Sequence, residues 1–549
     1  MITGKQYCEM VISGCNHISN QKAAINALNV FPVPDGDTGT NMSLTISAAA
    51  RELQGMGECT IAEASDKAAG AMLKGARGNS GVILSLLFRG ISKGLQDKET
   101  ADANELAEAI KQGVKAAYRA VMKPTEGTVL TVSRVASERL FRYIEKKGGT
   151  VAAERALTFY VREANRVLDQ TPEMLPQLKQ AGVVDAGGKG FAVVMEGMLL
   201  ALRGEPVQPE EMQAEVNDSV MDEMPLREED ITFTYCTEYI VEIEKDAKKK
   251  NPAELRAYLE SIGDSVVCVP DNEIIKVHVH TNHPGKAFEE ALLYGSLVNM
   301  KIDNMREEFR ERQKAQQAKE AQKPAYAEPT KRYGFVSVVA GEGLAALCKD
   351  LGIDTVVEGG QTMNPSTEDI LAAVDQTPSE IVFVLPNNKN IIMAAEQAKM
   401  LSSKKQVVVI PTKTVPQGIT AMLGFDENME PAELEEVMTA QIATVKTAQV
   451  TYAARDSVFD GHEIKEGQLL GLMETKVTFV EDKMEDVVRK LFEQLAADGG
   501  SYVNIYYGSD VTEEDANKIA EQVQAQLPEA EVLCLPGGQP VYHYIFSIE

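Results

Sequence analysis

The apolar positions of the first two hundred residues repeat with the spacing of an amphipathic helix. One such alanine-rich run covers residues 103–122, and strand-like alternation is scarce in this part of the chain. The pattern predicts an all-α bundle or barrel over residues 1–202. Residues 203–230 hold three prolines among many acidic side chains, a composition typical of a linker.

The pattern changes to that of strands from residue 232. Strand and helix patterns then follow in the order β-α-β-β-α-β, with a tight turn at Asp271-Asn272. This order predicts an α+β domain of the ferredoxin-like split βαβ type over residues 231–306. The next segment, residues 307–331, is charged and rich in glutamine, alanine and lysine, which indicates a solvated helix or a flexible linker.

Near-continuous apolar strands alternate with helices from residue 332 onward. This alternation is typical of a parallel α/β sheet covered by helices. A second part, residues 449–549, mixes strands and helices again, so residues 332–549 are predicted to form an α/β region of two parts. The loop at residues 359–366 is predicted to cap a helix that begins at Thr367.

Residues 29–42 carry the most informative chemistry of the chain. Asp35 and Asp37 flank Gly36, and a run of small and hydroxyl residues then opens a helical pattern. Carboxylate oxygens are hard ligands that suit Mg²⁺, and the free N–H groups of a helix N-terminus suit phosphate. The stretch predicts a magnesium–nucleotide site, whereas a simple Asp-Gly-Asp turn that caps a helix is the alternative.

Three further polar turns each precede a helical pattern, at intervals of roughly forty to sixty residues. In an up-and-down bundle, alternate helices begin at the same end. The four turns are therefore predicted to gather at one rim, where four positive helix ends would face a polyphosphate. The three turns are Gly75–Gly81, Pro124–Thr128 and Asp185–Gly190.

The Asp35-Gly36-Asp37 motif with Thr38–Met42, followed by Gly78–Gly81, resembles the nucleotide-binding subunit of dihydroxyacetone kinases. The whole chain resembles the ATP-binding subunit of bacterial fatty acid kinases, with specific motifs over about residues 1–200. The resemblance implies Mg–ATP binding by the helical domain and a DegV-like fold for the C-terminal α/β region. It also implies a homodimer, and an acceptor fatty acid held by a separate carrier protein that docks on the C-terminal region.

The kinase hypothesis gives each motif residue a role. Phosphoryl transfer needs mainly positioning and charge neutralisation, and a carboxylate acceptor needs no general base because it is ionised at neutral pH. Asp35 and Asp37 would hold Mg²⁺, and Asn29 is the nearest candidate for the third ligand that the dihydroxyacetone kinase pattern implies. The candidate nucleotide contacts are Thr38, Thr40, Asn41, Gly78, Asn79, Ser80, Gly81, Thr125, Thr128 and Asp185, and the candidate positive charges are Arg77 and Lys189.

A cysteine and two histidines form a second candidate site in the middle domain. His278 and His280 lie two apart on one predicted strand, so their side chains share a face, and Cys236 lies on a strand that can pair alongside. One thiolate and two imidazoles suit Zn²⁺, although two half-exposed histidines near a buried cysteine fit the pattern equally. The resemblance to fatty acid kinase, whose middle domain carries such a set, favours zinc.

The composition excludes several classes of protein. A formal net charge of −27 over 549 residues argues against binding to nucleic acid or to an anionic membrane surface. No apolar run approaches the roughly twenty residues of a membrane span, and the N-terminus lacks a signal-peptide pattern. Seven scattered cysteines fit a reducing compartment, so a cytoplasmic location is expected.

Three functions compete on this sequence. The leading hypothesis is a kinase that uses ATP and Mg²⁺ to phosphorylate the carboxylate of a carrier-bound fatty acid, giving an acyl phosphate. A dihydroxyacetone or other polyol kinase would show the same nucleotide motifs but needs a ketose-binding part that the C-terminal region does not obviously supply. A metal-dependent phosphatase or a zinc-stabilised scaffold is the third hypothesis.

Overall fold

The computed structural model describes most of the chain in two compact units. One unit combines Met1–Glu211 with Tyr326–Glu549, and the other is Met212–Ala325. The predicted linkers and the Asp271-Asn272 turn fall largely or wholly outside the described residues, and so does Asp35. The described ranges are 1–29, 36–121, 124–209, 232–243, 251–270, 274–306, 326–360, 364–453, 457–459, 462–474 and 476–549.

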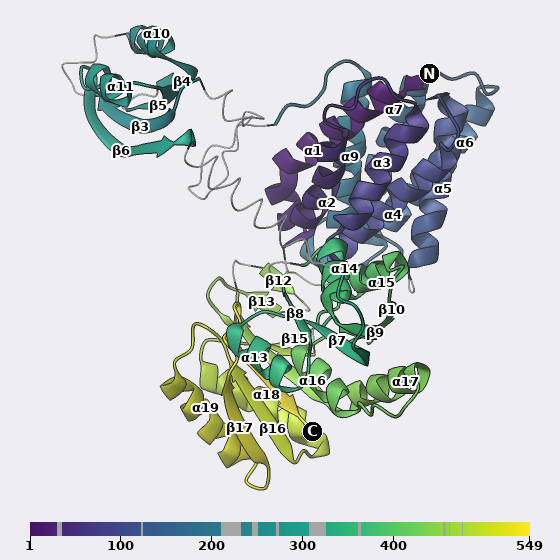
Figure 1. Ribbon diagram of the computed structural model, residues 1–549, viewed down its shortest axis with the longest axis vertical. Helices are drawn as coiled ribbons and strands as arrows, with labels where there is room; N and C mark the ends of the chain where they lie inside the picture. Colours follow the sequence, from purple (N-terminus) through teal and green to yellow (C-terminus); the bar gives the residue numbers. More distant parts are fainter. Residues whose placement is uncertain are drawn as a thin grey trace. The chain divides into compact units, whose positions relative to one another are not determined.

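The N-terminal part of the first unit is helical, as its amphipathic periodicity predicts (Figure 1). Polar residues begin several of these helices: Thr3, Thr60 and Asp102 each form a reciprocal capping box with the residue three positions on. A short antiparallel pair of strands, β1 (Ile2–Thr3) with β2 (Thr100–Ala101), holds the segment before α1 against the segment before α5. The helices are α1 (Gly4–Ala27), α2 (Thr38–Leu53), α3 (Ile61–Lys74), α4 (Gly78–Gly94), α5 (Ala103–Ala120), α6 (Val129–Lys146), α7 (Ala153–Leu168), α8 (Pro176–Ala181) and α9 (Ala186–Leu202).

The C-terminal α/β region begins with a parallel sheet in the order β10-β9-β7-β8. Its strands are apolar along most of their length because helices cover the sheet, which confirms the predicted α/β class. The strands are β7 (Lys331–Val339), β8 (Thr355–Glu358), β9 (Ser379–Leu385) and β10 (Gln406–Val409). The helices are α13 (Glu342–Asp350), α14 (Thr367–Gln376), α15 (Ile392–Leu401), α16 (Val415–Leu423) and α17 (Pro431–Gln441).

A second sheet completes the α/β region, in the order β15-β14-β11-β18-β16-β17. Only the β16–β17 pair among the ladders of this sheet is parallel. A small hairpin, β12 (Ser457–Phe459) with β13 (His462–Ile464), stands apart from it. The sheet and its helices are β11 (Lys446–Tyr452), β14 (Leu469–Met473), β15 (Lys476–Glu481), α18 (Met484–Leu495), β16 (Tyr502–Tyr507), α19 (Glu513–Gln526), β17 (Glu531–Pro536) and β18 (Tyr542–Ile548).

The helical domain and the parallel sheet share one hydrophobic core. Buried side chains of the helices, such as Phe88, belong to the same cluster as Val382 of β9 and Ile370 of α14. Helices α14 and α15 pack against α3 and α4. The N–H of Thr367, the first residue of α14, donates to the carbonyl of Ala76 at 3.2 Å. The two parts of the first unit are therefore docked by both apolar and polar contacts.

In its described residues, the second unit is an antiparallel sheet with two helices. Its strands run in the order β4-β5-β3-β6, and Tyr239, Val241 and Leu259 are among the side chains buried in its core. None of the helices in the described part of the chain has the length and hydrophobicity that a membrane crossing requires. The elements are β3 (Tyr235–Ile243), α10 (Pro252–Ile262), β4 (Gly263–Pro270), β5 (Ile274–Thr281), α11 (Pro284–Ala291) and β6 (Gly295–Asn304).

Candidate nucleotide and metal sites

The starts of α2, α4, α6 and α9 lie next to one another, as the sequence predicts. A Cβ on Gly78 of α4 would stand 2.5 Å from Nδ2 of Asn41 on α2, and one on Gly190 of α9 would stand 2.6 Å from the sulfur of Met42. A Cβ on Gly187 would lie 3.5 Å from Cβ of Val129, the first residue of α6. Four helix N-termini, each the positive end of a helix dipole, therefore lie in one region, which suits a polyphosphate.

Asp37 stands at the start of α2, directly before its first residue, Thr38. Its side chain does not cap the helix, while its backbone carbonyl accepts from the N–H of Asn41 at 2.8 Å. The carboxylate is half-buried and supplies hard oxygen donors of the kind that Mg²⁺ requires. Asn29 is buried beyond the end of α1, and its predicted role as third ligand remains a prediction.

Asn26 on α1 holds the first turn of α2 in place. Its Oδ1 accepts from the N–H of Thr40 at 3.1 Å, and its Nδ2 donates to the Thr40 hydroxyl oxygen at 3.0 Å. Thr40 is half-exposed, and its hydroxyl oxygen accepts this hydrogen bond from α1. Thr38 and Asn41 are buried in the same turn. No sequence motif identifies Asn26 as part of the site, because its role depends on how α1 packs on α2.

The α4 turn combines a left-handed backbone conformation at a glycine with a tight contact. Gly78 has φ +56°, a conformation that residues with a Cβ rarely adopt. The preceding N–H, that of Arg77, donates to Oγ1 of Thr45 on α2 at 3.3 Å. These contacts fix the first turn of α4, in which Asn79 and Ser80 remain half-exposed and Gly81 is buried.

Asp185 caps α9 and is fully enclosed. Its carboxylate accepts from the N–H of Gly188 at 2.6 Å. Burial raises the pKa of Asp185 to about 6, although backbone N–H donors from Gly188 and Val129 oppose that shift. Asp185 therefore organises the start of α9 beside α6, while Lys189 lies partly exposed on the first turn of α9.

The α6 turn is more open than the other three. Thr128 precedes the helix, and its hydroxyl donates to the carbonyl of Thr125 at 2.8 Å. Thr125 is exposed and Thr128 half-exposed, so both lie at the accessible edge of the region.

The C-terminal α/β region reaches into this site, which the sequence did not predict. Nδ2 of Asn364 donates to Oδ2 of Asp37 at 2.7 Å. Arg77, predicted as a positive charge for phosphate, donates from Nη1 to the carbonyl of Asn364 at 2.8 Å and lies 3.5 Å from Asp369. Nδ2 of Asn79 donates to Oδ1 of Asn390 at 3.1 Å. Three residues of the predicted magnesium–nucleotide site, Asp37, Arg77 and Asn79, thus contact the C-terminal region.

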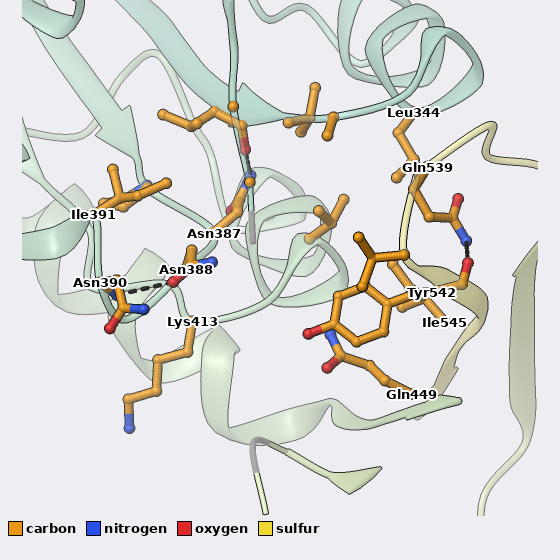
Figure 2. Close-up of a pocket in the computed structure, with 18 of the residues that line it drawn as sticks. Leu344, Asn387, Asn388, Asn390, Ile391, Lys413, Gln449, Gln539, Tyr542 and Ile545 are labelled. Carbon is orange, nitrogen blue, oxygen red and sulfur yellow. Dashed lines mark hydrogen bonds between the residues drawn. The ribbon is translucent and has the colours of Figure 1, made fainter. Parts of the chain in front are cut away.

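Asn390 also lines a cavity of the α/β region (Figure 2). Its N–H donates to Oδ1 of Asn388 at 2.9 Å, and Lys413 and Tyr542 lie around the same space. The cavity holds about 70 Å³, well below the roughly 300–1,000 Å³ of ordinary small-molecule sites. A long acyl chain does not fit in it.

Cys236, His278 and His280 come together in the middle domain. Cys236 on β3 pairs directly with His280 on β5, and one donor atom from each of the three residues lies within 4.8 Å of the others. The Nε2 atoms of the histidines are 3.2 Å apart, and Sγ of Cys236 is 3.9 Å from Nδ1 of His278. One sulfur and two imidazole nitrogens form a donor set that fits Zn²⁺.

Two carboxylates stand beside these histidines. Oε1 of Glu238 lies 2.9 Å from Nδ1 of His278, and Oδ1 of Asp264 lies 3.5 Å from Nδ1 of His280. Carboxylates in such positions orient the imidazole rings of metal sites and make the rings better ligands. Each histidine therefore has Nδ1 near a carboxylate while its Nε2 faces the other histidine.

Comparison with known proteins identifies the family of each part of the chain. A DAK2 domain model matches residues 32–200, the middle-domain model of the FakA-like fatty acid kinase family matches residues 232–312, and the C-terminal model of that family matches residues 334–549. Protein YloV of Bacillus subtilis is 41% identical over 557 residues, covering 100% of this chain and 99% of that protein. An uncharacterized Staphylococcus aureus protein is 39% identical over 552 residues, with the same coverage.

Two solved structures share parts of the fold at low similarity. A C. freundii dihydroxyacetone kinase in complex with AMP-PNP and Mg²⁺ is 18% identical, covers 36% of this chain and 33% of its own, and has a TM-score of 0.28. A fatty-acid-binding DegV family protein of Thermus thermophilus is 13% identical, covers 40% of this chain and 99% of its own, and has a TM-score of 0.31.

The helical domain is thus of the dihydroxyacetone kinase type, and the family models place the chain among the phosphotransferases. The chain belongs to the FakA-like fatty acid kinase family.

Proposed function

We propose that this protein is an ATP-dependent kinase that phosphorylates the carboxylate of a fatty acid presented by a separate carrier protein. The observation that carries the proposal is the gathering of four helix starts, one of which begins directly after Asp37. The oxygen of the ionised acceptor attacks the γ-phosphorus of ATP, the bond to the β,γ-bridging oxygen breaks, and the products are acyl phosphate and ADP. No proton has to be removed from the acceptor.

The chain contributes mainly binding and orientation to this reaction. Asp37, with its sequence neighbour Asp35, would hold Mg²⁺, which neutralises phosphate charge when bound. The first turns of α2 and α4 present backbone N–H groups and the Thr40 hydroxyl to phosphate oxygens. Asp185 holds the start of α9 beside the start of α6, because its carboxylate accepts hydrogen bonds from the N–H groups of Gly188 and Val129.

A separate carrier is supported by the chemistry of the acceptor. A fatty acid needs an apolar sleeve in water, and the cavity of about 70 Å³ described above is too small to be that sleeve. We therefore place the acyl chain in a partner of DegV-like type that docks on the C-terminal α/β region, and we propose a homodimer and a cytoplasmic location for the kinase.

We further propose that Cys236, His278 and His280 bind one Zn²⁺, within a middle domain of the ferredoxin-like type. Support comes from the donor set and from the carboxylates beside both histidines. The three ligands join adjacent strands β3 and β5, so metal binding would add directly to the stability of that sheet.

Replacing Asp37 tests the kinase proposal. The Asp37→Ala variant should lose at least a hundredfold in transfer of radiolabelled phosphate from ATP to fatty acid on a co-purified carrier, because the metal loses a charged ligand. Asp66→Ala is the matched control, since Asp66 is an exposed carboxylate on α3 that belongs to none of the converging turns. Equal transfer by the wild type and the Asp37 variant at saturating Mg²⁺ would refute the assignment.

A further inference from the structure

Asn364 lies in the loop before α14, yet its side chain meets a carboxylate 327 positions earlier in the chain. Nδ2 of Asn364 contacts Oδ2 of Asp37 at 2.7 Å. The side chain is 3% exposed, and its backbone carbonyl accepts from Arg77 at 2.8 Å. The residue is therefore held against the predicted metal ligand from both its backbone and its side chain.

The other end of the same amide has no partner. Oδ1 of Asn364 is buried and accepts no hydrogen bond from any residue that the structure describes. Most buried amide oxygens in proteins are paired with a donor, an ordered water or an ion. The oxygen would therefore give up no hydrogen bond to a described residue if the amide turned over, whereas the nitrogen is held by Asp37.

The separation from Asp37 fits a shared Mg²⁺. Neighbouring ligands of an octahedral Mg²⁺ with bonds of about 2.0–2.1 Å lie about 3 Å apart. The oxygen and nitrogen of an asparagine amide are nearly equal in size, so turning the amide over exchanges them without moving the backbone. The Asn364 oxygen would then take the position of its nitrogen, 2.7 Å from Oδ2 of Asp37.

We propose that Asn364 supplies an oxygen ligand to the magnesium of the nucleotide site. The α/β region would then complete the metal site of the helical domain, and Arg77 would serve to hold the Asn364 backbone in place. Without the cation, the amide donates to Asp37; with the cation, the amide is reversed and coordinates. This inference rests on the proposed Mg–nucleotide function and adds one ligand to it.

The test measures metal binding rather than turnover. Mn²⁺, which takes the same oxygen ligands, is titrated into the full-length protein with saturating ADP, and free Mn²⁺ is followed by electron paramagnetic resonance. Asn364→Ala should weaken Mn²⁺ binding about tenfold or more, whereas Asn364→Asp should bind it at least as tightly as the wild type. Asn390→Ala is the matched control, because it removes another side-chain contact at this junction and leaves Asn364 in place.

A thermal readout supports the titration. Without metal, Asn364→Asp places two carboxylates side by side, so its melting temperature should fall below that of the wild type and recover when Mn²⁺ and ADP are added. If Asn364→Asp does not fold, the comparison of Asn364→Ala with Asn390→Ala decides alone. Equal Mn²⁺ affinity in Asn364→Ala and wild type, or equal losses in Asn364→Ala and Asn390→Ala, would overturn the inference.

Asp37→Ala separates this inference from the function on which it rests. If Asp37→Ala binds Mn²⁺ with ADP as well as the wild type does, the proposed nucleotide site itself is wrong. If Asp37→Ala loses the metal while Asn364→Ala keeps it, the nucleotide site stands and only the Asn364 ligand is rejected.

Discussion

A methyl group added at Gly78 should disturb both the stability of the protein and its nucleotide site. Gly78 has φ +56°, and its missing Cβ would lie 2.5 Å from Nδ2 of Asn41. A residue with a side chain in this conformation costs about 1–2 kcal/mol, and forcing a methyl group into a packed contact costs about 1–3 kcal/mol more. Asn41 is 5% exposed, so it has little room to retreat.

Stiffening of the unfolded chain offsets about 0.4–1 kcal/mol of this cost. We therefore expect Gly78→Ala to lose about 2–4 kcal/mol. ADP affinity in the presence of Mg²⁺ should also fall tenfold or more, since one hydrogen bond to a charged group is worth about 1.5–3 kcal/mol and both Asn41 and the first turn of α4 must shift.

Two other glycines separate the causes. Gly148 has φ +68° with open space around it, so Gly148→Ala should show the backbone cost alone and keep full ADP affinity. Gly70 is an exposed helical residue of α3 with nothing within 4 Å of its missing Cβ, so Gly70→Ala should stabilise the protein by about 0.5–1 kcal/mol.

Differential scanning calorimetry and ADP titration calorimetry on the four proteins check the reasoning. Melting temperatures should fall in the order Gly70→Ala, wild type, Gly148→Ala, Gly78→Ala. If Gly78→Ala melts together with Gly148→Ala and binds ADP like the wild type, then the contact between Gly78 and Asn41 has neither the energetic nor the functional role that we assign to it.

Two further predictions concern a buried carboxyl and the cysteine–histidine set. Because burial raises the pKa of Asp185 from 3.8 to about 6, the folded state binds more protons than the unfolded state between these values, and stability falls as pH rises through this window. This loss of stability amounts to at most about 3 kcal/mol. In melting curves measured from pH 4 to 7, Asp185→Asn should show a smaller loss than the wild type. An equal loss in both proteins would contradict the raised pKa of Asp185. Elemental analysis should find one zinc per chain in the wild type and in the Cys268→Ala control but none in Cys236→Ala, and the same zinc content in all three proteins would reject the site.

Local patterns predicted the helical class of the N-terminal part and the α/β class of the C-terminal part. Helical periodicity and polar turns mark the starts of α2, α4, α6 and α9 because both signals lie within a few residues of each other. The loop before Thr367 was predicted as a helix cap, and Ser366 indeed forms a capping box with Asp369. The approach of Cys236 to the two histidines followed from strand pairing alone.

Contacts between distant segments were not predictable from these patterns. Asn364 meets Asp37 because α14 and α15 pack on α3 and α4, and a single asparagine in a loop carries no signal of that docking. Arg77 shows the same limit: its place in a glycine-rich turn suggested a phosphate contact, yet its guanidinium faces Asn364 and Asp369. The type of a side chain gives its chemistry, whereas its partner depends on tertiary packing.

The core shared by the helices and the parallel sheet has a consequence for how the protein is made. The first unit is built from two stretches of chain, with the middle domain inserted between them. During synthesis on the ribosome, the apolar face of α3 and α4 is not fully covered until strands as late as β10, which ends at Val409, have been made. At about 5–20 residues per second, the roughly 200 residues from the end of α9 to that strand take about 10–40 s. A nascent chain of this protein therefore exposes a hydrophobic surface for that interval. A gene that ends between the codons for α9 and β10 yields a product in which this surface is never covered.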